Sequence, residues 1–212
     1  MIYLIGGAPR VGKSIVSKSI AQAKGIEPIS TDDMESHFSE SIPEERRREL
    51  FPLPGFSGEP SENTLTPDER VKLQTIGAES LKTEIEKTIN EAINDHRDLV
   101  IEGIHLSPKI VRELIDKHGK DQIVASFVGS IDVERVISGM EKNTNPNDWL
   151  KDANEVVRQQ VAEFVVAFSK YVQEETQKNG FSYLERTDAF ESDMGRVTEL
   201  LLRSGEGKLP MK

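Results

Sequence analysis

The chain has 212 residues, a formal net charge of −10 and no cysteine. The acidic balance argues against a general nucleic-acid surface, because duplex binding needs a basic patch, and the lack of cysteine excludes disulfides and thiol catalysis. No run of residues approaches the roughly 18 apolar positions of a membrane span. We therefore expect a soluble, cytoplasmic protein of one domain, with no membrane partner and no long nucleic acid as partner.

The first element predicted is a strand over Met1–Ile5, followed by a glycine-rich loop and a helix. The loop, residues 7–14, reads GAPRVGKS and matches the phosphate-binding pattern GxxxxGK[ST], and residues 15–20 follow at helical spacing. Glycines let successive N–H groups point at phosphate oxygens, and the helix N-terminus adds partial positive charge. Lys13 would reach the outer phosphates, and the Ser14 hydroxyl would bind Mg²⁺. The predicted nucleotide-binding residues are Gly7, Ala8, Pro9, Arg10, Val11, Gly12, Lys13, Ser14 and Ile15.

The second predicted strand, Ile26–Ser30, is followed by two adjacent carboxylates, Asp32 and Asp33. A carboxylate at this edge of a sheet can accept the proton of an acceptor hydroxyl during phosphoryl transfer. The competing interpretation is that Thr31 or Asp32 caps the helix that follows. Capping needs only one side chain, so we expect Asp32 to orient the acceptor and Asp33 to be a candidate substrate contact.

A proline-rich segment, residues 39–68, then interrupts the pattern and predicts loops or short helices. A stretch this long within a compact domain is usually functional or mobile, so we expect it on the substrate side of the site, with an idle surface loop as the alternative. Its arginines, Arg46 among them, would gather around an anionic substrate or form a solvated helix face, and the second interpretation is slightly favoured.

A long helix is predicted over residues 67–96, and it leads into a third strand, Leu99–Glu102. An apolar strand that ends on an acid is the Walker B arrangement, in which the carboxylate organises Mg²⁺ or its water shell, although such a strand can also simply be leaving the core. The predicted metal ligands are therefore Ser14 and Glu102. His105, just beyond, would either contact a substrate or cap a loop.

The rest of the chain continues the alternation, with strands at Ile123–Val128 and Phe181–Leu184 and a last helix over residues 190–201. Alternating strands and helices predict a parallel sheet covered on both faces, with ligands at the carboxyl ends of its strands. A polar segment, residues 142–152, is the candidate lid, with an idle surface loop as the alternative. Arg135 and Arg158, on either side of it, are candidate substrate contacts or ordinary surface residues.

Three blocks of sequence resemble the 2-phosphoglycerate kinase type of P-loop kinase: residues 5–7 (IGG), 30–32 (STD) and 100–108 (VIEGIHLSP). The resemblance covers roughly residues 1–110, and the last third matches only in element order. It implies a three-layer α/β/α fold with a five-stranded parallel sheet, ATP and Mg²⁺ as cofactors, and a small-molecule acceptor. Polynucleotide and zeta-toxin-like kinases share the Asp-Asp pair, and in them the first Asp is the base, which maps onto Asp32. This chain departs from its relatives at Glu35, where they commonly carry an arginine.

The leading hypothesis is an ATP-dependent kinase that moves the γ-phosphoryl group to a small, anionic metabolite such as 2-phosphoglycerate, with Lys13, Asp32 and Glu102 as its catalytic residues. One alternative is a zeta-toxin-like or nucleotide-end kinase, and another is a regulatory NTP-binding protein. A GTPase is disfavoured because no [NT]KxD sequence is present. We expect one kinase domain over residues 1–204 and a flexible tail over 205–212. The identity of the acceptor, the preference for ATP over other nucleoside triphosphates and the oligomeric state are left open.

Overall fold

The computed structural model describes residues 1–59, 64–142 and 148–207, and within them strands and helices alternate as the sequence predicts. Every predicted strand is present, with ends that differ from the prediction by two residues at most. The elements in chain order are β1 (Ile2–Gly7), α1 (Lys13–Lys24), β2 (Pro28–Ser30), α2 (Thr31–Glu40), α3 (Glu44–Leu50), α4 (Pro67–Asn94), β3 (Leu99–Gly103), α5 (Pro108–His118), β4 (Ile123–Gly129), α6 (Val133–Glu141), α7 (Glu155–Asn179), β5 (Tyr183–Glu185) and α8 (Phe190–Gly205).

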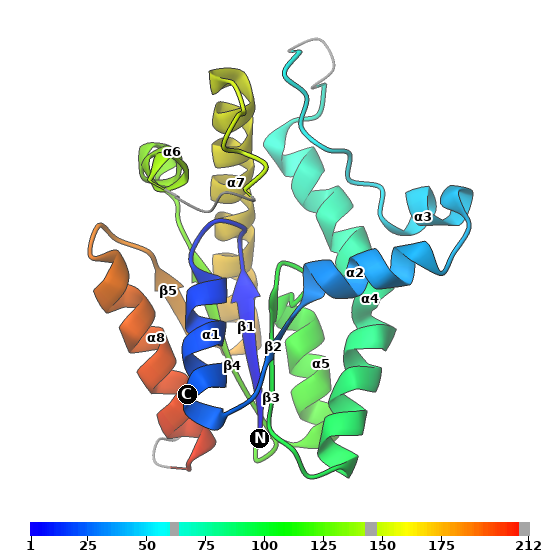
Figure 1. Cartoon of the computed structure of the whole chain (residues 1–212), viewed down its shortest axis with the longest axis vertical. Helices are drawn as coiled ribbons and strands as arrows, with labels where there is room; N and C mark the ends of the chain where they lie inside the picture. The colour runs from blue at the N-terminus through cyan, green and yellow to red at the C-terminus, as the bar shows by residue number, and fades with distance from the viewer. Residues whose placement is uncertain (60–63, 143–147, 208–212) are drawn as a thin grey trace.

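The strands form one parallel sheet in the order β2-β3-β1-β4-β5. Helices α1 and α8 pack together on one face, and α4, α5 and α7 pack together on the other (Figure 1). One helical layer on each face of a parallel sheet makes a three-layer α/β/α arrangement, which confirms the predicted fold class.

The central strands β1, β3 and β4 are buried along their whole length. Their apolar sequences are nearly unbroken because both faces of the sheet are covered by helices. The register pairs Ile5 of β1 with Glu102 of β3, and Glu102 in turn pairs with Ser30 of β2. These three strands therefore end level, so the P-loop, Glu102 and the start of α2 share one edge of the sheet.

The N-cap of α2 is Ser30, whose hydroxyl accepts a hydrogen bond of 3.2 Å from the backbone N–H of Asp32. The competing interpretation, in which Thr31 or Asp32 caps this helix, is therefore wrong, because the cap is the residue before Thr31. A serine hydroxyl fits the requirement because it can accept a backbone N–H of the first turn from extended backbone. As a consequence, neither carboxylate, Asp32 or Asp33, is occupied by capping.

The two irregular segments are described in part. In the substrate-side segment, residues 39–68, the structure shows the end of α2, the short helix α3 and extended chain, while residues 60–63 lie outside the described part. Of the candidate lid, residues 143–147 lie outside it, and so do residues 208–212 of the predicted tail, which follows α8. In the described ranges, no helix is both long enough and apolar enough to cross a membrane.

Candidate active site

The loop between β1 and α1 takes its shape from backbone conformations that favour glycine. Gly7 and Gly12 have φ angles of +131° and +103°, in the region that L side chains rarely adopt. A Cβ atom on Gly7 would lie 1.9 Å from the carbonyl oxygen of Val128, so this position also has no room for a side chain. Arg10, at the turn of the loop, has a φ of +64°. The loop thus wraps around the N-terminus of α1, as the sequence motif predicts.

Lys13 is buried, and its Nζ atom donates a 2.6 Å hydrogen bond to the carbonyl oxygen of Ala8. Burial lowers the pKa of Lys13, since a charged ammonium loses its hydration there, and the nearby carboxylates of Glu102 and Asp32 oppose that shift. One residue on, the Ser14 hydroxyl donates a 2.6 Å hydrogen bond to the Glu102 carboxylate, which is itself only 9% exposed. The structure thus brings together the three residues predicted for the outer phosphates and the metal.

A cavity of about 1000 Å³ opens from this loop. It is lined by the loop and the start of α1, by Asp32 and Glu102 at the strand ends, and by residues of α6, α7 and the β5–α8 connection. Of the residues predicted from the sequence, those that line it are Pro9, Arg10, Gly12, Lys13, Ser14, Ile15, Asp32, Glu102 and Arg135. The phosphate loop and the candidate acceptor-orienting carboxylate therefore face one space.

The two aspartates of α2 differ in position. Asp32 lines the cavity with a side chain that is 74% exposed. Asp33 is also exposed but is not among the residues that line the cavity. The geometry therefore distinguishes two residues that the sequence presented as neighbours of equal chemistry.

His105 is 2% exposed and is held by residues of α2. Its Nδ1 atom lies 3.0 Å from the hydroxyl of Thr31, and its Nε2 atom lies 3.0 Å from the carboxylate of Glu35. Asp32 is next to this group, with Oδ1 at 3.8 Å from Nδ1. The side chain thus joins the end of β3 to the acidic turn of α2, and it does not line the cavity itself.

Three other predicted substrate contacts have partners in the structure. Arg46 forms an ion pair of 2.5 Å with Glu49 on the exposed face of α3, and Arg158 donates to the carbonyl of Lys151. Neither lines the cavity, and the environment of Arg46 fits the solvated helix face that the sequence slightly favoured. Arg135 does line it, and donates a 2.9 Å hydrogen bond to Asp188.

The cavity has an aromatic wall that was not predicted from the sequence. Phe56, Trp149 and Phe164 line it, and the rings of Phe56 and Trp149 stack with centroids 6.4 Å apart and an interplanar angle of 15°. The guanidinium of Arg70 also contacts this stack and lies over the Phe56 ring, 4.2 Å from its centre. The signal in the sequence was an aromatic residue within each of the two irregular segments, but nothing in the sequence paired them.

Asp148 and Arg10 form a second link between these segments and the loop. The Arg10 guanidinium donates two hydrogen bonds, of 2.5 and 2.7 Å, to the Asp148 carboxylate, and it also lies 5.7 Å from the centre of the Trp149 ring. Asn154, at the start of α7, donates to the carbonyl of Gly58. The described end of the candidate lid therefore contacts both the P-loop and the substrate-side segment.

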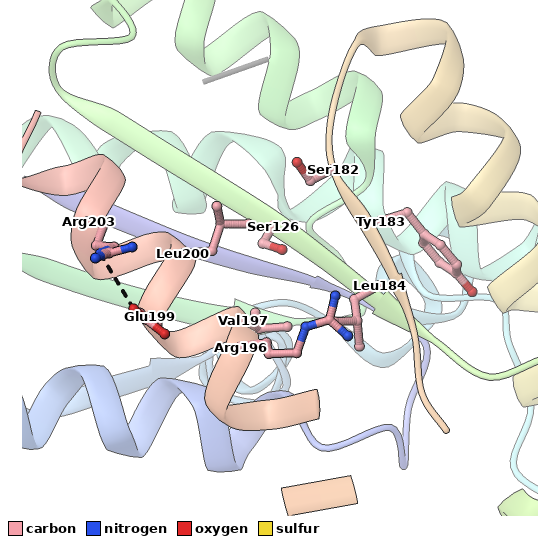
Figure 2. A pocket seen from close by; sticks show the side chains of 9 residues that line it. All are labelled: Ser126, Ser182, Tyr183, Leu184, Arg196, Val197, Glu199, Leu200 and Arg203. Carbon is pink, nitrogen blue, oxygen red and sulfur yellow. Dashed lines mark ion pairs between the residues drawn. The ribbon is translucent and has the colours of Figure 1, made fainter. Parts of the chain in front are cut away.

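A smaller pocket, of about 350 Å³, lies between the β4–β5 edge of the sheet and α8 (Figure 2). Ser126, Leu184 and Leu200 are among its lining residues, and Arg203 forms an ion pair of 3.5 Å with Glu199 at its border. None of the predicted site residues lines this pocket. The candidate site is therefore the P-loop cavity.

The comparisons with known proteins agree with this geometry. No protein-family model matches the chain. A curated protein of Methanothermobacter thermautotrophicus, named 2-phosphoglycerate kinase, is 27% identical over 218 residues, which span 97% of this chain and 68% of that protein. The match thus extends past residue 110, to the part of the chain where the sequence analysis recognised only the order of elements.

Among solved structures, a gluconokinase from Sinorhizobium meliloti 1021 matches with a TM-score of 0.50 and 16% identity, over 97% of this chain and 93% of that one. An uncharacterised protein from Eubacterium ventriosum matches with a TM-score of 0.50 and 12% identity, over 98% of each chain. At these identities the two likenesses concern the fold alone. With the curated relative, the fold and the P-loop geometry taken together, the chain is identified as a P-loop kinase.

Proposed function

We propose that this kinase moves the γ-phosphoryl group of ATP to a hydroxyl group of a small, anionic metabolite. One observation carries the proposal: the P-loop, Glu102 and the exposed carboxylate of Asp32 face a single cavity of about 1000 Å³. Phosphoryl transfer depends mostly on positioning and on electrostatic stabilisation, and this cavity offers groups for both. An NTP-binding protein without an acceptor would have no need of a carboxylate such as Asp32 in that place.

The residues at the start of α1 and at the end of β3 fit a bound Mg-nucleotide. Mg²⁺ prefers oxygen ligands and is usually held by one or two carboxylates together with substrate phosphates and water. The Ser14 hydroxyl and the Glu102 carboxylate, with oxygens 2.6 Å apart, are such a donor set. When bound, Mg²⁺ would neutralise charge on the phosphates. Lys13 would turn from the Ala8 carbonyl toward the outer phosphates, and their charge would favour its protonated form.

Asp32 would orient the acceptor. Its carboxylate is exposed to the cavity and is free of a capping role, because Ser30 caps α2. A carboxylate in that place can accept the hydroxyl proton as the oxygen attacks the phosphoryl group. Its partner Asp33, outside the cavity lining, is proposed to have no direct role in the chemistry.

The acceptor class rests on the curated relative and on charge. The relative named 2-phosphoglycerate kinase supports a phosphorylated hydroxy acid as acceptor, and the cavity lining, although it also holds four acidic side chains, has five cations that could bind an anion. Those cations are Arg10, Lys13, Arg135, Lys142 and Arg186. The net charge of −10 disfavours a long polyanion such as a nucleic acid as the acceptor.

Residues 148–152 are proposed to be part of a lid. Transfer to an acceptor must exclude water, since water in the site would turn the kinase into an ATPase. Arg10 binds Asp148, and Phe56 stacks on Trp149, so this segment bridges the phosphate loop and the substrate-side segment across the cavity. The lid would close the cavity through these two contacts.

The test is an assay of ATP consumption by the purified protein against a panel of phosphorylated hydroxy acids, sugars, sugar acids and nucleosides, with product mass confirmed. We expect one acceptor class to raise turnover strongly, and Lys13→Ala to abolish it. Equal, slow ATP hydrolysis with every compound would contradict the proposal and favour a regulatory NTP-binding protein. Preference for a nucleoside or an oligonucleotide end would favour the nucleic-acid-end alternative.

A further inference from the structure

Arg186 is a buried arginine that neither the sequence motif nor the resemblance pointed to. It follows β5 directly, where its backbone N–H donates to the carbonyl of Gly129 and so extends the β ladder by one step. Its side chain points toward the P-loop and lines the large cavity. The residue as a whole is only 8% exposed. The position thus adds a cation to the cavity from the last strand of the sheet.

The guanidinium of Arg186 is held from three sides. Its Nη1 atom donates a 3.2 Å hydrogen bond to the carbonyl oxygen of Arg10 in the P-loop, and its plane covers the ring of Phe190 at 4.8 Å. On the third side is Gly139 of α6, where a Cβ atom would lie 2.7 Å from Nη2. Glycine weakens a helix interior, so a glycine at position 139 needs a packing reason. That reason is that a side chain here would occupy the space that the guanidinium fills.

This buried cation has no carboxylate partner. Among the described residues no acid lies within ion-pair distance of Arg186, and its Nε atom, also buried, has no hydrogen-bond partner. Burial lowers the pKa of Arg186, and the charge of Arg135 lowers it further, while the more distant carboxylates of Asp188 and Asp193 partly oppose the shift. A guanidinium buried without an ion-pair partner costs stability, and an anion in the adjacent cavity would reduce that cost.

We propose that Arg186 is a phosphate-binding residue of the site, which supplies charge and N–H donors to the triphosphate group of the nucleotide. The proposal rests on the proposed function for the assumption that a triphosphate occupies the P-loop. Arginine suits this role because its charge persists when buried and its donors are fixed in one plane. The stacking on Phe190 and the contact with Arg10 would hold the guanidinium ready before the nucleotide binds.

Two variants separate a phosphate contact from a structural one. Arg186→Gln keeps an N–H donor for the Arg10 carbonyl and removes the charge, whereas Arg186→Lys keeps the charge. Isothermal titration with ATP, GTP and inorganic tripolyphosphate, each with Mg²⁺, should show losses of affinity on the order of 10- to 100-fold for Arg186→Gln, similar for all three ligands, and a smaller loss for Arg186→Lys. Arg97→Gln, the same change at an exposed arginine before β3, is the control and should bind as the wild type.

Thermal unfolding distinguishes a phosphate contact of Arg186 from a purely structural role. Arg186→Gln without ligand should melt at the wild-type temperature or higher, because it removes an uncompensated charge, and the rise in Tm caused by tripolyphosphate should shrink. A lower Tm in the absence of ligand with an unchanged ligand-induced rise would assign Arg186 to the fold alone. Affinity retained in Arg186→Gln but lost in Arg186→Lys would show that the charge at this position does not support binding, and would overturn the phosphate contact.

The remaining outcomes of the titration separate this inference from the proposed function. A loss confined to ATP and GTP, with tripolyphosphate unaffected, would reassign Arg186 to the nucleoside and overturn the phosphate contact. Unchanged affinities in Arg186→Gln would overturn this inference and leave the proposed function standing. Wild-type protein that binds none of the three ligands would overturn both.

Discussion

The Nε2 atom of His105 lies 3.0 Å from the carboxylate of Glu35, one turn beyond Asp32 on α2. The resemblance described above implies that an arginine is common at this position, where this chain has glutamate. An arginine here would place a donor-only, permanently charged group against the imidazole, whereas glutamate can accept a hydrogen bond from it. Glu35 and His105 are therefore matched, and together they tie the end of β3 to the helix that carries Asp32.

We predict that this contact positions Asp32. His105→Asn should lower kcat by about 10- to 100-fold, because small misplacements of a catalytic group are costly, while leaving the affinity for Mg-ATP nearly unchanged. Glu35→Gln, which keeps an acceptor oxygen, should retain most of the activity, and Glu35→Arg should lose it. Steady-state kinetics together with nucleotide titration tests this. A change in nucleotide affinity with kcat intact would contradict a positioning role.

Asp32 and Asp33 should separate clearly in the same assay. Asp32→Asn is expected to lose on the order of 10²–10⁴ in turnover, the usual contribution of a general base, with little effect on nucleotide binding. Asp33→Asn is the matched control, since it makes the same chemical change one residue away, outside the cavity lining. Turnover lost in Asp33→Asn and kept in Asp32→Asn would reverse the two roles.

Lys13 should make the stability of the ligand-free protein depend on pH. Its pKa is lowered below 10.5 in the folded state, so the unfolded chain binds this proton more tightly. As far as Lys13 is concerned, the free energy of unfolding should therefore rise with pH over the range between its lowered folded-state pKa and its ordinary pKa of 10.5. Lys13→Met removes this contribution, so it should be more stable than the wild type near neutral pH, with an advantage that narrows as the pH rises.

Urea denaturation of the wild type and Lys13→Met at a series of pH values measures that difference directly. Other lysines titrate in the same range, but they are common to both proteins and cancel in the comparison. Lys13→Met should also fail to bind Mg-ATP. Wild-type nucleotide affinity in this variant would show that the loop does not bind phosphates.

Trp149 is the single tryptophan of the chain and a built-in probe of the lid. Its ring stacks on Phe56 and lies over Arg10 of the P-loop, so nucleotide binding at the loop should alter its surroundings. We expect its fluorescence to change on addition of Mg-ATP and again with acceptor, and hydrogen exchange at residues 148–152 to slow when both are bound. Asp148→Asn, which breaks the ion pair with Arg10, should weaken both responses. Emission that is indifferent to both ligands would make this segment a fixed connection.

The local sequence was sufficient for the parts of the site that depend on short-range physics. The loop of residues 7–14 needs glycine at positive φ angles and a strand and helix on either side, all of which are properties of adjacent residues. Glu102 was found the same way, because a buried parallel strand must end at the edge where ligands bind. The alternative interpretation placed the cap of α2 at Thr31 or Asp32 and not at Ser30, since all three side chains can cap and only the backbone decides between them.

The contacts between distant segments were decided by tertiary packing alone. His105 and Thr31 are 74 residues apart in the chain, Arg10 and Asp148 are 138 apart, and Arg186 lies 176 residues from the carbonyl that it contacts. Hydrophobic periodicity predicts which face of an element is buried, but it does not say which polar side chain the neighbouring element will place opposite. For that reason the sequence named the phosphate loop, the proposed metal ligands and the proposed acceptor carboxylate, whereas only the folded structure showed the aromatic wall, the partner of Glu35 and the buried charge of Arg186.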